Sequence, residues 1–93
     1  MEIDFDPAKN ERNIRERGLS FQRVENLEWR TALVVEDTRF PHSERRFEAI
    51  AALGERLHVV IFSQIANGVR VISFRKANLR EARRYAKSQS RND

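Results

Sequence analysis

The chain has 93 residues, of which 34% are charged, with a formal net charge of +4 and no cysteine. This length allows one domain, and the lack of cysteine excludes disulfides and thiolate metal sites. Because the N-terminus has no signal-peptide pattern and no apolar run is long enough to cross a bilayer, we expect a cytoplasmic protein. We expect residues 1–88 to form the domain and residues 89–93 to be a polar tail.

Basic residues are concentrated toward the C-terminal end. Residues 1–69 contain ten basic and twelve acidic side chains, whereas residues 70–93 contain eight basic and two acidic ones. This asymmetry indicates a polyanion or an acidic protein as the partner. A basic helix that is simply solvated is the alternative.

The N-terminal third predicts a short strand followed by two helices. Residues 2–5 alternate between polar and apolar side chains, as in a strand. Asp6 is a good N-cap for the first helix, which Gly18 ends at about Arg17. A second helix is expected after Ser20, because apolar residues recur every three positions at Phe21, Val24 and Leu27.

The middle of the chain predicts strands. Residues 31–35 are rich in β-branched side chains, and residues 45–53 alternate. Two further runs, 57–63 and 69–75, flank Asn67-Gly68, a dipeptide that supports the positive φ values of a tight hairpin turn. Because the connections between these runs are short, we expect an antiparallel meander.

That turn predicts the register of the hairpin. A two-residue loop at Asn67-Gly68 pairs Ile61 with Phe74, and Val60 with Arg75. One face would then be apolar and carry Ile61, Ile65, Ile72 and Phe74. The other face would be mixed, with Val60, Phe62, Gln64, Val71, Ser73 and Arg75. A sheet face that ends in arginine can hold an anion on a rigid platform.

The last helix begins after Asn78, which forms a capping box with Glu81. Its inner stripe is Leu79, Ala82, Tyr85 and Ala86, and its outer face is Arg80, Arg83, Arg84 and Lys87. The sequence therefore predicts an α+β fold. Two N-terminal helices and one C-terminal helix pack on an antiparallel meander of about four to five strands.

Several short segments, in their order and spacing, resemble the BrnT-like toxins of bacterial type II toxin–antitoxin systems. They are Phe5-Asp6 with Lys9 and Asn13, Gly18-Leu19-Ser20-Phe21, Glu44-Arg45-Arg46-Phe47, Val59-Val60-Ile61-Phe62, Val69-Arg70-Val71-Ile72-Ser73, Arg75-Lys76-Ala77, Glu81 and Tyr85. The resemblance covers nearly the whole chain and implies a RelE-like ribonuclease fold. It implies cleavage of mRNA, inhibition of translation and neutralisation by a BrnA-like antitoxin. The antitoxin's ribbon-helix-helix domain, not the toxin, would bind operator DNA.

The chain departs from this family at a few positions. The family often has arginine where this chain has Ile65 and Ala82, and alanine where it has Phe74. Loss of a phosphate-binding arginine would weaken catalysis. The alternative is therefore a catalytically weakened homologue that binds an antitoxin or RNA. A structural partner protein, whose basic helix docks on an acidic segment, is a third possibility.

Metal-free RNA cleavage needs positive charge at the phosphate, which arginine supplies through its planar fork. Arg70 and Arg75 are the first candidates, and Arg46 is the next. Strict alternation puts Arg70 and Arg75 on opposite faces, so either a β-bulge turns one of them or only Arg75 faces the site. Alternatively both pair with acids such as Glu44 or Glu48.

The remaining candidates have weaker support. His58 titrates in the range of a general base and is expected on the same hairpin face as Arg75, whereas a packed histidine is the alternative. Tyr85 would stack on RNA or belong to the core. Lys9 and Asn13 are expected to face outward and touch substrate, or to be merely solvated. Further substrate-binding candidates are Lys76, Arg80 and Arg84. We expect no metal site or cofactor, because the two histidines are far apart and cysteine is absent.

Overall fold

The computed structural model describes residues 1–39 and 44–90. Five strands form one sheet in the order β1-β5-β4-β3-β2. The strands are β1 (Glu2–Asp4), β2 (Leu33–Asp37), β3 (Arg46–Leu53), β4 (Arg56–Ile65) and β5 (Gly68–Lys76). Strands β2 to β5 form the expected antiparallel meander, whereas β1 pairs with β5 in parallel. The α+β class is confirmed, and the sheet is mixed.

Capping residues determine where both α-helices begin. Helix α1 (Pro7–Arg17) begins after Asp6, whose side chain accepts a hydrogen bond from the Ala8 amide, and ends at Gly18 with φ 65°. Helix α2 (Leu79–Ser90) begins with the predicted capping box, in which Asn78 and Glu81 exchange two hydrogen bonds of 2.9 Å. Helix α2 includes residues 89 and 90, which were expected in the tail; residues 91–93 lie outside the described part.

The second N-terminal helix was predicted correctly in position but not in type. It consists of two 3₁₀ segments, η1 (Phe21–Asn26) and η2 (Trp29–Thr31). Ser20 caps the first segment through its hydroxyl, as expected. A 3₁₀-helix has three residues per turn, so its geometry matches a three-residue apolar repeat better than an α-helix does.

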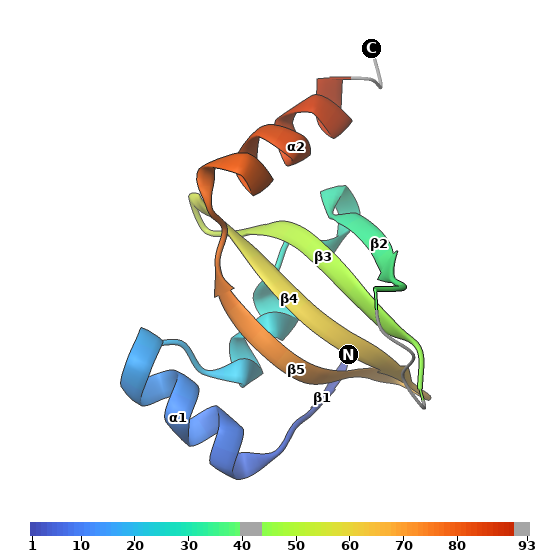
Figure 1. The fold of residues 1–93 in the computed structure, drawn as a ribbon. Coiled ribbons are helices and arrows are strands. Elements are labelled where there is room, and N and C mark those ends of the chain that lie inside the picture. The colour runs from blue at the N-terminus through green and yellow to red at the C-terminus, as the bar shows by residue number, and fades with distance from the viewer. Residues whose placement is uncertain (40–43, 91–93) are drawn as a thin grey trace.

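The two faces of the sheet are covered differently. Residues of η1, together with Leu19 and Leu27, pack on one face, which we call the inner face. The other face, which we call the open face, packs against α2 at one end, and no other described helix covers it. Figure 1 shows α2 at that end of the sheet and η1 behind the central strands. One end of the open face is therefore apolar and covered by α2, and the rest is not covered by a described helix.

The predicted hairpin register is wrong by one or two residues. Ile65 pairs with Gly68, so the two-residue loop is Ala66-Asn67. Among the described residues, only Gly18 and Gly54 have positive φ, so Gly68 does not serve the turn. Instead, a Cβ on Gly68 would lie 1.9 Å from the Glu2 carbonyl oxygen of β1. This glycine allows β1 to approach β5.

A β-bulge determines which side chains share a face. The register shifts by one between the pairs Phe62–Val71 and Ile61–Ser73, so Ile72 is an extra residue in β5. Val71 and Phe74 therefore both point into the inner core, with Val60 and Phe62 opposite them. The faces predicted from strict alternation are wrong: Phe74 lies on the inner face, and Arg75 lies on the open face.

Candidate functional site

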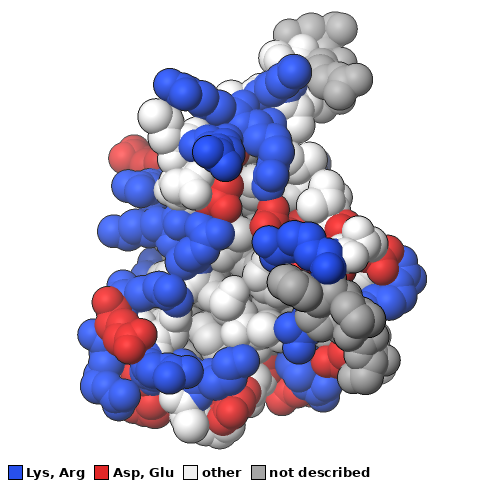
Figure 2. Space-filling model, in the orientation of Figure 1, with Lys and Arg blue, Asp and Glu red and all other residues white. Residues whose placement is uncertain are grey.

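The open face carries three rows of side chains across the strands. The row under α2 is apolar and ends in Arg75, and the middle row contains Glu48 and Ile61. The row farthest from α2 contains Arg46, Ser63 and Arg70. Figure 2 shows basic side chains bordering a pale, hollowed area over the central strands. The bulge therefore brings the three candidate arginines onto one face.

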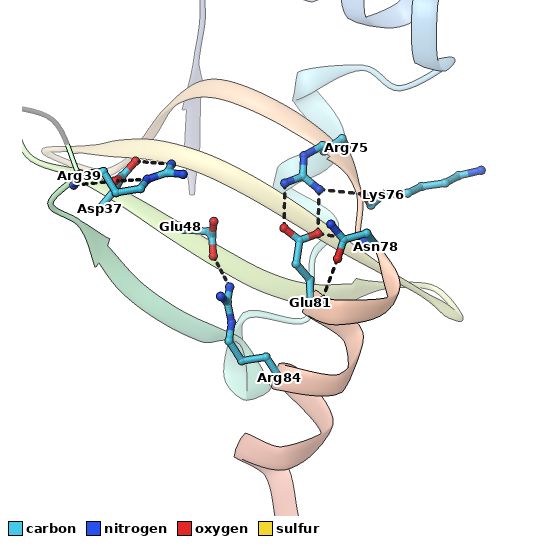
Figure 3. A network of polar contacts seen from close by, with 8 residues as sticks. All are labelled: Asp37, Arg39, Glu48, Arg75, Lys76, Asn78, Glu81 and Arg84. Atoms are coloured by element: carbon cyan, nitrogen blue, oxygen red, sulfur yellow. Dashed lines mark hydrogen bonds and ion pairs between the residues drawn. The ribbon is translucent and has the colours of Figure 1, made fainter.

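Arg75 forms a bidentate ion pair with Glu81 of α2 (Figure 3). Each of its two terminal nitrogens lies 2.8 Å from a carboxylate oxygen. The bonds from Arg75, together with one from the Asn78 amide, lower the pKa of Glu81 from 4.5 to about 2. The pair fixes the position of Arg75 at the border of the open face and neutralises much of its charge.

Arg70 is paired with two carboxylates. Its Nε lies 2.8 Å from Asp4, its neighbour on β1, and its Nη1 lies 3.5 Å from Glu44. These partners raise the pKa of Arg70, and the hydrogen bond that Arg70 donates to Asp4 is the largest cause. The pairing with Glu44 was one of the expected alternatives. The Arg70 side chain is 46% exposed, so these pairs are weak and a phosphate can compete with them.

Helix α2 supplies Arg84 and Tyr85 to the same face. Arg84 forms an ion pair with Glu48 (Figure 3). The two line a hollow of about 220 Å³ beside β2. The Tyr85 ring packs at the covered end, and its hydroxyl lies 3.4 Å from Thr31 Oγ1. Arg80 is exposed on the surface of α2.

Arg46 differs from Arg70, Arg75 and Arg84 because no carboxylate among the described residues holds it. No hydrogen bond or ion pair joins its side chain to another residue in the described part of the chain, and its Nε is buried without an acceptor. Ser63, on the neighbouring strand, is 1% exposed, and its hydroxyl also has no partner. A buried donor without an acceptor costs about 1–3 kcal/mol. The open face thus has unused hydrogen-bonding capacity at this point.

His58 lies on the inner face and not beside Arg75, so the expected grouping of these two residues is wrong. Its ring packs 5.5 Å from the Phe74 ring, and its Nδ1 lies 2.9 Å from the Arg56 carbonyl oxygen. Burial is the main cause that lowers the pKa of His58. The sheet separates this imidazole from the arginines of the open face.

The expected outward orientation of Asn13 is also wrong. Its amide group is buried and donates to the carbonyls of Leu19 and Phe74, while its oxygen accepts from Arg17. Asn13 therefore joins α1 to β5. Lys9 is exposed and lines a hollow beside Asn13.

A third hollow lies where α1 approaches the end of β5. It has a volume of about 360 Å³ and is lined by Arg17, Leu19, Arg75 and Lys76. Three of these four residues are basic, which makes this hollow electropositive. The predicted candidates Arg75 and Lys76 are thus joined by Arg17, which sequence analysis did not identify.

Sequence analysis also missed Ser63 and the pairing of Arg75 with Glu81. Ser63 interrupts the apolar run of β4, and a polar residue there is the only signal that the sequence offers. Glu81 was assigned a capping role, which it has, but the same carboxylate also binds Arg75. The six-residue separation of this pair spans a strand end and a helix start, so no local rule predicts it.

The fold and the site together define a class: a small α+β protein whose open sheet face gathers arginines. The sequence model of a family described as "Ribonuclease toxin, BrnT, of type II toxin-antitoxin system" matches residues 5–81. The chain belongs to this BrnT family, which confirms the resemblance noted in its sequence. No curated protein matches the chain.

The described residues lack two further features, a metal-ligand cluster and a membrane-spanning helix. Within residues 1–39 and 44–90, no group of three His, Asp or Glu side chains is placed to hold a metal ion. No helix in this part of the chain has the length and apolar character needed to span a membrane.

Proposed function

We propose that the protein is a metal-independent endoribonuclease toxin that cleaves mRNA in the cytoplasm and so inhibits translation. The observation that supports this most is the gathering of Arg46, Arg70 and Arg75 on one open sheet face. Guanidinium groups stay charged and bind phosphate oxygens through paired hydrogen bonds. Family membership gives the reaction class.

The proposed reaction places charge stabilisation on these arginines. The ribose 2′-hydroxyl gives up its proton to water and attacks the adjacent phosphorus. The bond to the 5′-oxygen breaks and that oxygen takes a proton from water, so the products are a cyclic phosphate and a 5′-hydroxyl end. Arg46 and Arg70 would stabilise the charge on the phosphorane oxygens. Arg75 and Tyr85 border the α2 end of this face and would contact the adjoining nucleotide.

The remaining candidates extend the positive surface beyond Arg46, Arg70 and Arg75. Lys76 lies in the hollow beside Arg75, and Arg80 and Arg84 lie on α2. We assign them to the phosphates that flank the cleaved bond. Such contacts would make binding sensitive to salt, because each one releases counterions.

We further propose that an antitoxin neutralises the protein by covering the same face. A BrnA-like partner with a ribbon-helix-helix domain would bind operator DNA, so the toxin would reach DNA only through its partner. Charge supports this, because the basic side of α2 borders the open face and would attract an acidic segment.

The test is RNA cleavage by the purified protein in EDTA, with and without ribosomes. Arg46→Gln is the matched variant, because Arg46 has no ion pair to break in the described structure. We expect the wild-type protein to cut RNA and the variant to lose most of that activity at an unchanged melting temperature. Intact RNA at high wild-type concentration in both conditions would refute the proposed activity.

A second function is supported by a specific observation. Arg70 and Arg75 are engaged by the carboxylates of Asp4, Glu44 and Glu81, and Ile65 and Ala82 stand where the family often has arginine. A catalytically weakened homologue that binds RNA or an antitoxin would have this pattern. It predicts RNA binding without cleavage and normal growth on induction, whereas growth arrest that Arg46→Gln abolishes would exclude it.

A further inference from the structure

Two buried polar atoms on the open face have no hydrogen-bond partner in the described part of the chain: the Ser63 hydroxyl oxygen and Arg46 Nε. Ser63 is 1% exposed, and Arg46 is half-buried. Buried polar groups in proteins are nearly always hydrogen-bonded, so an unpartnered pair calls for an explanation. Within the described part of the chain, the fold gives no reason why these two atoms should lack hydrogen-bond partners.

The two residues are neighbours on adjacent strands. Phe47 of β3 pairs with Phe62 of β4, and Arg46 and Ser63 are the next residues beyond that pair. On its other side, Ser63 pairs with Arg70 of β5. Because cross-strand neighbours lie about 5 Å apart, the hydroxyl sits between two guanidinium-bearing side chains.

We propose that Arg46, Ser63 and Arg70 form a subsite for one phosphate of single-stranded RNA. The inference rests on the proposed function, and it adds Ser63 as a ligand-binding residue. Arg46 Nε can only donate, and a serine hydroxyl donates as well, so the missing ligand must accept hydrogen bonds. Two arginines at the same point favour an anion.

The described carboxylates near this point already have arginine partners, and none of them accepts from Arg46. Asp37, which faces Arg46 across β2 and β3, is bound through both oxygens by Arg39. Asp4 of β1 accepts from Arg70 Nε at 2.8 Å, and Glu44, two residues before Arg46 in the chain, lies 3.5 Å from Arg70 Nη1. The Arg70 side chain is 46% exposed. Because both arginine side chains are long, Arg46 and Arg70 can move apart and bind an anion between them, next to the Ser63 hydroxyl. A buried water molecule that bridges Ser63 and Arg46 is the competing explanation.

The variant Ser63→Ala separates these explanations. It removes only an oxygen that makes no protein hydrogen bond, so the melting temperature should not fall. Ser73→Ala is the matched control, since Ser73 lies in the middle row of the same face and is partly exposed. With a short fluorescein-labelled RNA, we expect fluorescence anisotropy to give about ten-fold weaker binding for Ser63→Ala. Binding by Ser73→Ala should equal that of the wild type.

A second readout does not depend on cleavage. The Nε–Hε resonance of Arg46, assigned by its disappearance in Arg46→Lys, is followed while adenosine 3′-monophosphate is added. We expect a saturable shift in the wild-type protein that needs about ten-fold more nucleotide in Ser63→Ala. If this shift occurs but RNA stays uncut, the proposed ribonuclease activity fails and the subsite stands. If RNA is cut, and Ser63→Ala binds both RNA and nucleotide like the wild type, the subsite is refuted.

Discussion

The ion pair between Arg75 and Glu81 predicts how the fold responds to acid. Glu81→Gln removes the charge of the carboxylate but keeps an oxygen that can accept from the Asn78 amide, so the capping box survives. A pKa that falls from 4.5 to about 2 corresponds to roughly 3 kcal/mol of stability at neutral pH. The Arg75 side chain is 37% exposed, and solvent screening reduces this to about 1–2 kcal/mol.

The stabilisation depends on pH with a definite sign. The pKa of Glu81 is lower in the folded state than in the unfolded chain, so the contribution is complete above about pH 5 and lost as the pH falls from 4.5 toward 2. Urea unfolding of the wild type and Glu81→Gln, at neutral pH and at acidic points down to about pH 2, measures the difference. We expect Glu81→Gln to be less stable at neutral pH and equal to the wild type at the acidic end.

A suitable control is Glu55→Gln, because Glu55 is exposed in the turn before β4 and has no ion pair in the described structure. It should leave the free energy of unfolding unchanged at every pH. If the deficit of Glu81→Gln stayed constant between neutral pH and about pH 2, lost charge pairing would not be its cause and the reasoning would be refuted.

Three further predictions address the fold and the surface. Gly68→Ala should lower the free energy of unfolding by at least roughly 2 kcal/mol, because the new Cβ would clash with the backbone of Glu2. Thermal unfolding measures this loss, and an unchanged stability would contradict the close approach of β1 to β5. Asn13→Ala should cost about 2–3 kcal/mol in urea unfolding, since the Leu19 and Phe74 carbonyls lose their donor. Arg80→Gln should leave stability unchanged and reduce the salt slope of RNA binding by about one; an unchanged slope would remove Arg80 from the RNA surface.

The elements that sequence analysis predicted well are those set by local chemistry. Asp6, Gly18 and Asn78 each act within one turn of helix, so their roles follow from a few adjacent residues. Strand content followed in the same way from runs of β-branched residues. The family resemblance also came from short segments, and the match over residues 5–81 confirms it.

Two errors arose from reading a local signal as if it had one meaning. The three-residue apolar repeat after Ser20 was assigned to an α-helix, although the same spacing fits a 3₁₀-helix better. Gly68 was assigned to a turn, where glycine is common, but its small size serves contact with β1. The residue that requires glycine at position 68 is Glu2, which is distant in sequence. Rules for hairpin turns consider only neighbouring residues and therefore cannot predict this contact.

The composition of the open face depends on one extra residue. Arg70 and Arg75 are five positions apart, an odd separation that places them on opposite faces of a regular strand. Ile72 adds a residue to β5 without adding one to β4, so the alternation resumes with Arg75 on the same side as Arg70. Nothing in the sequence near Ile72 specifies a bulge there. The physical cause lies in the inner core, because Val71 and Phe74 can both be buried only if β5 gains a residue between them. The burial of two large apolar side chains outweighs the loss of regular strand pairing. The arginine face is thus a consequence of how the opposite face packs.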